Sequence, residues 1–125
     1  MRIVYDYPPY KRALRSFWPK WEGRCVCAVD DAGVLGGCGF TKVVDGRTSA
    51  FTLGIRRGWA SRSLYAAIMR LPVKMGAEEV VANCGRNIRS QAVCRQMGLS
   101  EVGAGVFKAT SEGLLKRAKE IEDAS

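Results

Sequence analysis

Two arginines and a glycine stand directly before an apolar helical pattern in the middle of the chain. Arg56 and Arg57 lead into Gly58, the small Ala60 follows two positions later, and the helical pattern occupies residues 64–71. The free backbone N–H groups and the positive end of a helix bind anions, and glycine lets a phosphate approach the backbone closely. The stretch therefore predicts a phosphate-binding turn that opens a helix. The alternative is a basic turn without a ligand.

The same turn contains an aromatic residue. Trp59 stands between Gly58 and Ala60, and Ser61 is the last residue of the predicted turn. An indole ring at this position either packs under the helix or stacks on an adenine or another nucleobase. Both interpretations stay open at the level of the sequence.

Two further side chains are candidate proton donors. Cys94 belongs to a predicted helix over residues 87–98, and Tyr65 lies on the helix that follows the turn. A thiol with an ordinary pKa near ~8.5 can protonate a thiolate, and a tyrosine is a weaker alternative acid. The competing interpretation of Cys94 is a buried structural cysteine.

Apolar patterns predict the elements that must position these residues. Strands are predicted over residues 2–5, 24–29, 34–44, 47–55, 78–84, 99–103 and 105–110. Helices are predicted from Pro8-Pro9 to Pro19, over 64–71 up to Pro72 with a stop at Gly76, over 87–98 and over 111–123. Asp45-Gly46 is a typical two-residue hairpin turn, so the strands on either side of it pair antiparallel.

Helical spacing also predicts which side chains face the core. The predicted core positions are Tyr10, Leu14, Phe17 and Trp18, then Leu64, Ile68 and Leu71, then Ile88, Ala92, Val93 and Met97, and finally Leu114, Leu115, Ala118 and Ile121. Gly36, Gly37 and Gly39 lie inside one predicted strand and indicate a bulge or a close backbone approach there.

The order of elements indicates one α+β domain over residues 1–125. An antiparallel meander is followed by a crossover helix and by a fifth strand parallel to the fourth. This layout resembles the GNAT superfamily, whose members transfer an acyl group from a coenzyme A thioester to an amine. The resemblance implies a mixed, mostly antiparallel central sheet flanked by helices, with the fourth and fifth strands parallel and splayed.

The second half of the chain carries the more specific resemblance. GNAT domains commonly have an Asn, a small residue, an aromatic residue, a Lys and a Gly-Phe at fixed spacings after the fifth strand. Those spacings are occupied here by Asn87, Ser90, Cys94, Gln96, Gly98 and Leu99. Cys94 therefore stands at the position of the family's general acid. The alternative is that Asn87 only caps its helix and that Gly98 and Leu99 only end it.

Residues 55–60 resemble the pyrophosphate loop of the same family, with Ile55 where a Gln or Arg is expected. The resemblance implies that acetyl-coenzyme A, or another acyl-coenzyme A, is bound by the backbone of Phe51 and Leu53, by the turn over residues 56–61, and by Asn87 and Ser90. The acceptor is then an amine on a small molecule, a protein or a nucleic acid. The family's usual glutamate base is absent from residues 47–55.

The charge indicates an anionic partner, because 20 Lys and Arg against 12 Asp and Glu give a net charge of +8. One set of basic residues comprises Arg56, Arg57, Arg62, Arg86, Arg89 and Arg95, which converge if two helix starts flank one cleft. A second set comprises Lys11, Arg12, Arg15, Lys20 and Arg24, with Tyr10, Trp18 and Trp21 between them. The second functional hypothesis is thus a non-catalytic GNAT-fold module that binds protein or nucleic acid.

The remaining expectations concern the setting of the protein. No apolar run is long enough to span a membrane, and the first residues lack the apolar core of a signal peptide, so a cytoplasmic protein without a membrane partner is expected. Five cysteines without histidine predict reduced thiols rather than a metal site. The small size is similar to that of minimal GNAT-like proteins of tailed bacteriophages. The sequence leaves open whether the protein forms a homodimer.

Overall fold

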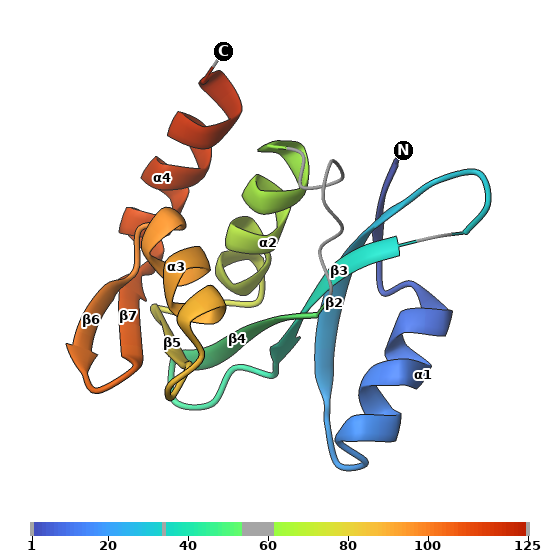
Figure 1. Ribbon diagram of the computed structural model, residues 1–125, viewed down its shortest axis with the longest axis horizontal. Coiled ribbons are helices and arrows are strands. Elements are labelled where there is room, and N and C mark those ends of the chain that lie inside the picture. Colours follow the sequence, from blue (N-terminus) through green and yellow to red (C-terminus); the bar gives the residue numbers. More distant parts are fainter. Residues whose placement is uncertain (1, 34, 54–61, 125) are drawn as a thin grey trace.

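The computed structural model describes residues 2–33, 35–53 and 62–124, and the side chains of residues 35–41 and 49–53 lie outside that description. Figure 1 shows helices on both sides of a twisted sheet. The elements in chain order are β1 (Arg2–Tyr5), α1 (Pro8–Phe17), β2 (Gly23–Val29), β3 (Leu35–Thr41), β4 (Arg47–Leu53), α2 (Arg62–Lys74), β5 (Glu79–Asn83), α3 (Ile88–Gln96), β6 (Ser100–Gly103), β7 (Val106–Thr110) and α4 (Ser111–Asp123).

The strands form one seven-stranded sheet in the order β1-β2-β3-β4-β5-β7-β6. Neighbouring strands run antiparallel except β4 and β5, which are parallel. The prediction of an α+β fold, and of a fifth strand parallel to the fourth, is therefore confirmed. Parallel strands need a long crossover connection, because a tight hairpin can join only antiparallel strands. The segment that contains α2 is the crossover between β4 and β5.

The predicted hairpin turn between β3 and β4 is confirmed. Asp45 and Gly46 have φ angles of 51° and 75°, as a type I′ turn requires, and Val44 and Arg47 exchange backbone hydrogen bonds of 2.8 and 2.9 Å. The Gly46 carbonyl then accepts a 2.6 Å hydrogen bond from the backbone N–H of Glu78. This contact places the beginning of β5 beside the beginning of β4.

The predicted stop at Gly76 is also confirmed. Gly76 has a φ of 88°, its N–H donates to the Val73 carbonyl, and the Ala77 N–H donates to the Pro72 carbonyl. These two bonds form a Schellman cap, which needs a residue in the left-handed conformation. Pro72 lies inside α2, two residues before its end, where it has no N–H to donate to the carbonyl four residues earlier.

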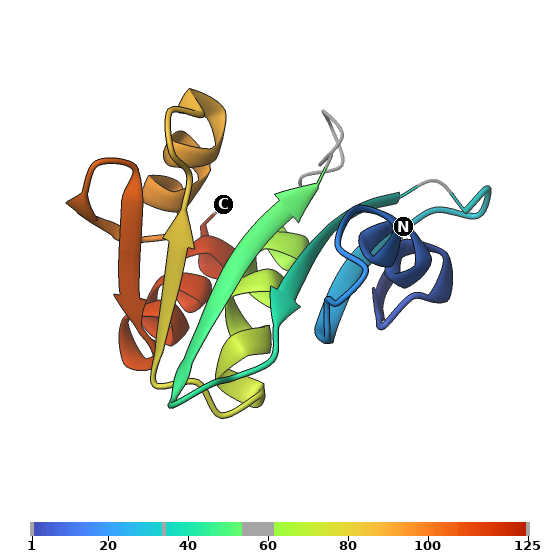
Figure 2. The same cartoon turned by 90° about the horizontal axis from the view of Figure 1, so that it is seen from below.

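The two faces of the sheet have separate cores. Along β2, Val26 and Ala28 pack with α2 and α4, whereas Cys25 and Cys27 point to the other face and pack with α1. The alternation is the expected consequence of the two-residue period of a strand. Both cysteines are fully buried free thiols. Figure 2 shows α1 separated by the sheet from α2 and α4.

Several predicted core positions are wrong. Phe17 is 71% exposed and Trp18 is 44% exposed, and the chain after Pro19 turns back so that Trp21 is buried in the α1 core instead. In α3, Ile88 is 78% exposed and Ala92 is exposed as well, because only the last turn of that helix reaches the core.

Two smaller expectations also differ from the structure. Leu115 of α4 is 43% exposed, since Leu114 and Ala118 take the face toward α2. The register of β2 with β3 runs without interruption through Gly36, Gly37 and Gly39, so the predicted bulge is not there. The register shift lies in β6 instead, between Glu101 and Gly103.

Candidate functional site

The candidate site lies at the carboxyl ends of β4 and β5. Their register joins Arg47–Ser49 to Glu79–Val81, and both strands continue beyond it, to Leu53 and Asn83. Figure 2 shows the two strands separating toward these ends. In sheets with parallel strands, ligands bind outside the carboxyl ends, where loops lead into helices. Here β4 leads toward α2 and β5 leads into α3.

The predicted phosphate-binding turn lies outside the described residues, and so do the side chains of Phe51 and Leu53. The residues of this turn are Arg56, Arg57, Gly58, Trp59, Ala60 and Ser61. The description resumes at Arg62, the first residue of α2. The Arg62 guanidinium donates a hydrogen bond to the Ala124 carbonyl just after α4, so α2 begins where α4 ends.

The start of α3 is a fully formed cap. The Asn87 side chain accepts a 3.0 Å hydrogen bond from the backbone N–H of Ser90. The preceding turn is fixed by a 3.1 Å bond from the Gly85 N–H to the Asn83 side chain and a 2.6 Å bond from the Gln91 side chain to the Gly85 carbonyl. Asn87 therefore caps α3, and its contact with a ligand stays a prediction. Asn87 is exposed, so its amide nitrogen can still donate to a ligand.

The end of α3 is capped as well. Gly98 has a φ of 85°, its N–H donates to the Arg95 carbonyl, and the Leu99 N–H donates to the Cys94 carbonyl at 2.9 Å. This is a second Schellman cap, with Leu99 and Cys94 both in the core. The spacing from Asn87 to Gly98 is thus the length of one helix with a capping residue at each end. That physical requirement explains these two positions without any ligand.

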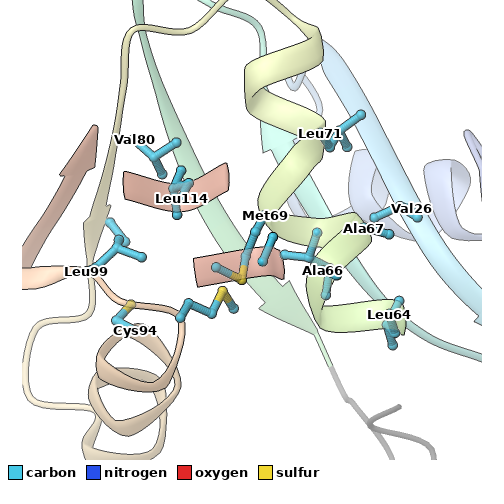
Figure 3. Packing of buried hydrophobic residues seen from close by; sticks show 14 of the residues in the cluster. Val26, Leu64, Ala66, Ala67, Met69, Leu71, Val80, Cys94, Leu99 and Leu114 are labelled. Carbon is cyan, nitrogen blue, oxygen red and sulfur yellow. The ribbon is translucent and has the colours of Figure 1, made fainter. Parts of the chain in front are cut away.

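Cys94 is buried and is held protonated. It is 8% exposed, and its Sγ lies 3.4 Å from the Sγ of Cys84, at the end of β5. Burial, followed by the hydrogen bond with Cys84, raises the pKa of Cys94 from 9.0 to about 12. Figure 3 shows Cys94 near Leu99 at the edge of the core. A thiol of ordinary pKa gives up its proton more readily, so Cys94 is a poor acid at neutral pH.

Tyr65, the other candidate acid, lines a pocket of about 340 Å³ between α2, α3 and α4. Arg62, Gln96, Met97 and Arg117 also line this pocket. Burial raises the pKa of Tyr65, so its hydroxyl is protonated at neutral pH. The structure therefore brings Tyr65 to the last turn of α3, but Cys94 is not among the described residues that line the pocket.

The predicted convergence of basic residues is wrong for Arg62 and Arg95 and stays a prediction for the others. Arg86 and Arg89 are exposed around the start of α3. Arg95 turns toward β6 and β7 instead, where its guanidinium lies 3.5 Å from Glu101 and 5.3 Å from the centre of the Phe107 ring. Arg62 donates its hydrogen bond to the Ala124 carbonyl, just after α4. Arg56 and Arg57 fall outside the described residues.

The acidic residues lie at the opposite end of the strands. Asp45, Glu78 and Glu79 line a hollow at the amino ends of β4 and β5. Glu79 forms ion pairs with Arg47 of β4 and with Lys108 of β7, the latter at 3.3 Å. This network was missed from the sequence, because its members come from three strands and no local spacing connects them. It neutralises charge on the sheet and offers no base to the carboxyl ends.

Two statements apply to the described part of the chain. Across residues 2–33, 35–53 and 62–124, no three His, Cys, Asp or Glu side chains gather where they could bind a metal ion. Within the same ranges, none of the helices combines the length and the apolar character needed to cross a bilayer.

A scan against models of known protein families finds no match to this chain. A search of curated proteins finds no similar sequence either.

Proposed function

We propose that this protein is an N-acyltransferase that uses an acyl-coenzyme A, such as acetyl-coenzyme A, and acts on an amine. The single observation that carries the proposal is the parallel pair β4 and β5 inside an otherwise antiparallel sheet, with a helix following each carboxyl end. This is the arrangement that the resemblance to the GNAT superfamily implies, and it supports a ligand site at that edge of the sheet.

The surroundings of this edge fit an anionic ligand. The start of α3 offers the positive end of a helix, the exposed amide of Asn87 and the exposed cations Arg86 and Arg89. The sequence places Arg56 and Arg57 before the start of α2. A bound acyl-coenzyme A would supply the acyl group as a thioester, and its phosphates would be neutralised by these groups.

Acyl transfer forms a C–N bond to the amine and breaks the C–S bond of the thioester, so the amine loses a proton and the leaving thiolate gains one. Of the two candidate donors, Tyr65 is the more accessible, because it lines a pocket while Cys94 is buried against Cys84. The segment of β4 carries no carboxylate. We therefore assign Tyr65 the role of acid and leave proton removal from the amine to solvent or to the acceptor.

Binding is tested first, through the thermal midpoint of unfolding with excess acetyl-coenzyme A. A ligand at ~100 times its dissociation constant adds ~2.7 kcal/mol, which raises the midpoint of a domain of this size by several degrees. Inorganic pyrophosphate at equal ionic strength is the control for the general effect of anions on a protein of charge +8. The increase should disappear in Gly58→Leu and persist in Gly76→Ala. No increase at millimolar acetyl-coenzyme A contradicts the proposal.

Turnover is tested by the release of free coenzyme A thiol in the presence of amines such as polyamines, lysine peptides and aminoglycosides. Tyr65→Phe removes the hydroxyl and keeps the ring, so it should lower kcat by about 10²-fold or more with little change in KM. Cys94→Ser should change kcat much less. If Cys94→Ser abolishes thiol release while Tyr65→Phe does not, the assignment of the acid is wrong.

The second candidate function is binding of an acyl-coenzyme A or another anion without turnover. It is favoured by one specific observation, the burial of Cys94 with its Sγ 3.4 Å from the Sγ of Cys84, because the resemblance places the family's acid at Cys94. Stabilisation by acetyl-coenzyme A without thiol release from any amine would support this candidate.

A further inference from the structure

Two aromatic rings stand in solvent at the end of α1, away from the site at β4 and β5. Phe17 is 71% exposed and Trp18 is 44% exposed. Their ring centres are 5.9 Å apart, and the ring planes are tilted by 49°. Both side chains are thus accessible to solvent, and a planar group can stack on an exposed aromatic ring.

The surroundings of these rings are basic. Between Asp6 and Glu22 the chain carries Lys11, Arg12, Arg15 and Lys20 and no acidic residue. Arg12 and Arg15 are exposed on α1 and three residues apart, so they lie on the same side of the helix, and Trp18 follows at the same spacing. Lys20 is exposed just beyond the rings.

The ion pairs of this region involve Lys11 but not Arg12, Arg15 or Lys20. Asp6 is engaged by Arg24 at 3.0 Å and lies 4.0 Å from Lys11, and Glu22 is engaged by Lys42 at 3.2 Å. Arg12, Arg15 and Lys20 form no ion pair with the residues that the structure describes. Three exposed cations therefore accompany two exposed rings, and the chain as a whole carries a charge of +8. We call Arg12, Arg15, Phe17, Trp18 and Lys20 the α1 surface.

We propose that the α1 surface binds single-stranded nucleic acid. Unpaired bases offer flat faces that stack on Phe17 and Trp18, and the phosphates beside them match Arg12, Arg15 and Lys20. Duplex DNA keeps its bases stacked inside, so it offers the cations a partner but not the rings. The proposal concerns a surface separate from the acyl-coenzyme A site, and it holds whether or not that site is active.

The test measures binding of the full chain to a fluorescein-labelled oligothymidine of 20 nucleotides by anisotropy, with a duplex of equal length as comparison. Phe17→Ala and Trp18→Ala should each weaken binding to the single strand by about tenfold, the loss expected for one stacked base. Phe17→Tyr keeps the ring and should bind like the wild type. Because Phe17 is exposed, the Phe17 variants should unfold at the wild-type temperature, which circular dichroism checks.

The cations are tested by the dependence of binding on salt. Arg12→Ala/Arg15→Ala should lower the slope of log K against log salt by about 1.4, or about 0.7 for each lost phosphate contact. Lys116→Ala/Lys119→Ala removes the same charge from exposed positions on α4 and is the matched control. It should leave the slope and the affinity almost unchanged.

Four outcomes overturn the proposal. Equal weakening by the α1 and α4 double variants would show that only the net charge attracts the oligonucleotide. Equal affinity for the single strand and the duplex, or full binding by Phe17→Ala and Trp18→Ala, would exclude stacking. Binding to anionic phosphatidylserine vesicles but not to the oligonucleotide would assign the α1 surface to a membrane instead.

Discussion

Helices α1 and α3 are both partly buried, but they bury opposite ends. α1 buries Tyr10 and Leu14 in its first two turns and ends in the exposed Phe17. α3 begins with the exposed Ile88 and buries Met97 directly after its last turn. In both helices an apolar pattern extends beyond the core that it packs on. The difference teaches that helical spacing defines a face, whereas the extent of the sheet decides how much of that face is covered.

The two helices also begin differently. α1 has prolines in its first turn, and its capping residue Tyr7 makes no side-chain cap. α3 begins at the Asn87 cap and ends at the Gly98 cap, and a turn of the chain fixed by Gly105 lies against its start. α1 is therefore held by its buried side chains, whereas α3 is held at both ends by hydrogen bonds to the backbone.

The largest expected effects come from truncating the buried anchors of the two helices. Leu14→Ala and Met97→Ala should each lower the free energy of unfolding by about 2–5 kcal/mol, because each leaves a cavity in a core. Phe17→Ala and Ile88→Ala, one in each helix, should change it by about 0.5 kcal/mol or less. Urea unfolding of the four variants checks this. A large loss in Phe17→Ala would mean that α1 is covered over its whole length.

The next effect tests the turn that supports α3. A Cβ on Gly105 would lie 2.1 Å from the Gly85 carbonyl oxygen, and Gly105 has a φ of 70°. Gly105→Ala should therefore cost ~3 kcal/mol, from left-handed strain and from the displaced turn before α3. The matched control is Gly76→Ala, where φ is 88° but no atom lies within 4 Å, so only the strain of ~1 kcal/mol applies. Equal losses in the two variants would show that the close approach is absent in solution.

A smaller effect separates the two roles of Asn87. Asn87→Ala should lower the free energy of unfolding by ~1 kcal/mol through loss of the cap, and Asn87→Ser should restore it. If Asn87 also donates to the coenzyme, both variants lose stabilisation by acetyl-coenzyme A, because serine restores the cap but not the amide. If Asn87→Ser responds to acetyl-coenzyme A like the wild type, the residue is only a cap. α1 offers no equivalent position, since its first turn has no side-chain cap.

Much of the fold could be predicted, because its signals are local. The turns at Asp45-Gly46 and at Gly76 require positive φ angles, which few other residue types adopt. Both turns are confirmed. The parallel pair β4 and β5 followed from the crossover helix between two strands. These inferences need only neighbours in the sequence.

What failed or was missed depends on contacts between distant segments. Phe17 and Ile88 have the right spacing for a core, and nothing local says that the sheet ends before them. The contact of Cys84 with Cys94 joins the end of β5 to the last turn of α3, and it changes the chemistry of a candidate acid. The position of the site at the carboxyl ends of β4 and β5 stays a prediction. For Cys94 the sequence left two interpretations open, and the structure confirms the buried cysteine. The packing of α3 decides between the two, and no local spacing shows that packing.

The smallest expected effect is a change of stability with pH, and it distinguishes Cys94 of α3 from Leu14 of α1. Cys94 has its pKa raised from 9.0 to about 12 in the folded state, so above pH 9 the unfolded chain loses a proton that the folded chain keeps. The unfolded state is thereby favoured, and the stability that Cys94 contributes is complete below pH 9 and is lost between pH 9 and about 12. The difference in unfolding free energy between the wild type and Cys94→Ala should hence shrink over that range. The difference for Leu14→Ala should stay constant, because the anchor of α1 does not ionise. If the Cys94→Ala difference is also constant from pH 7 to pH 11, the thiol is not buried as the structure has it, and Cys94 regains its place as a candidate acid beside Tyr65.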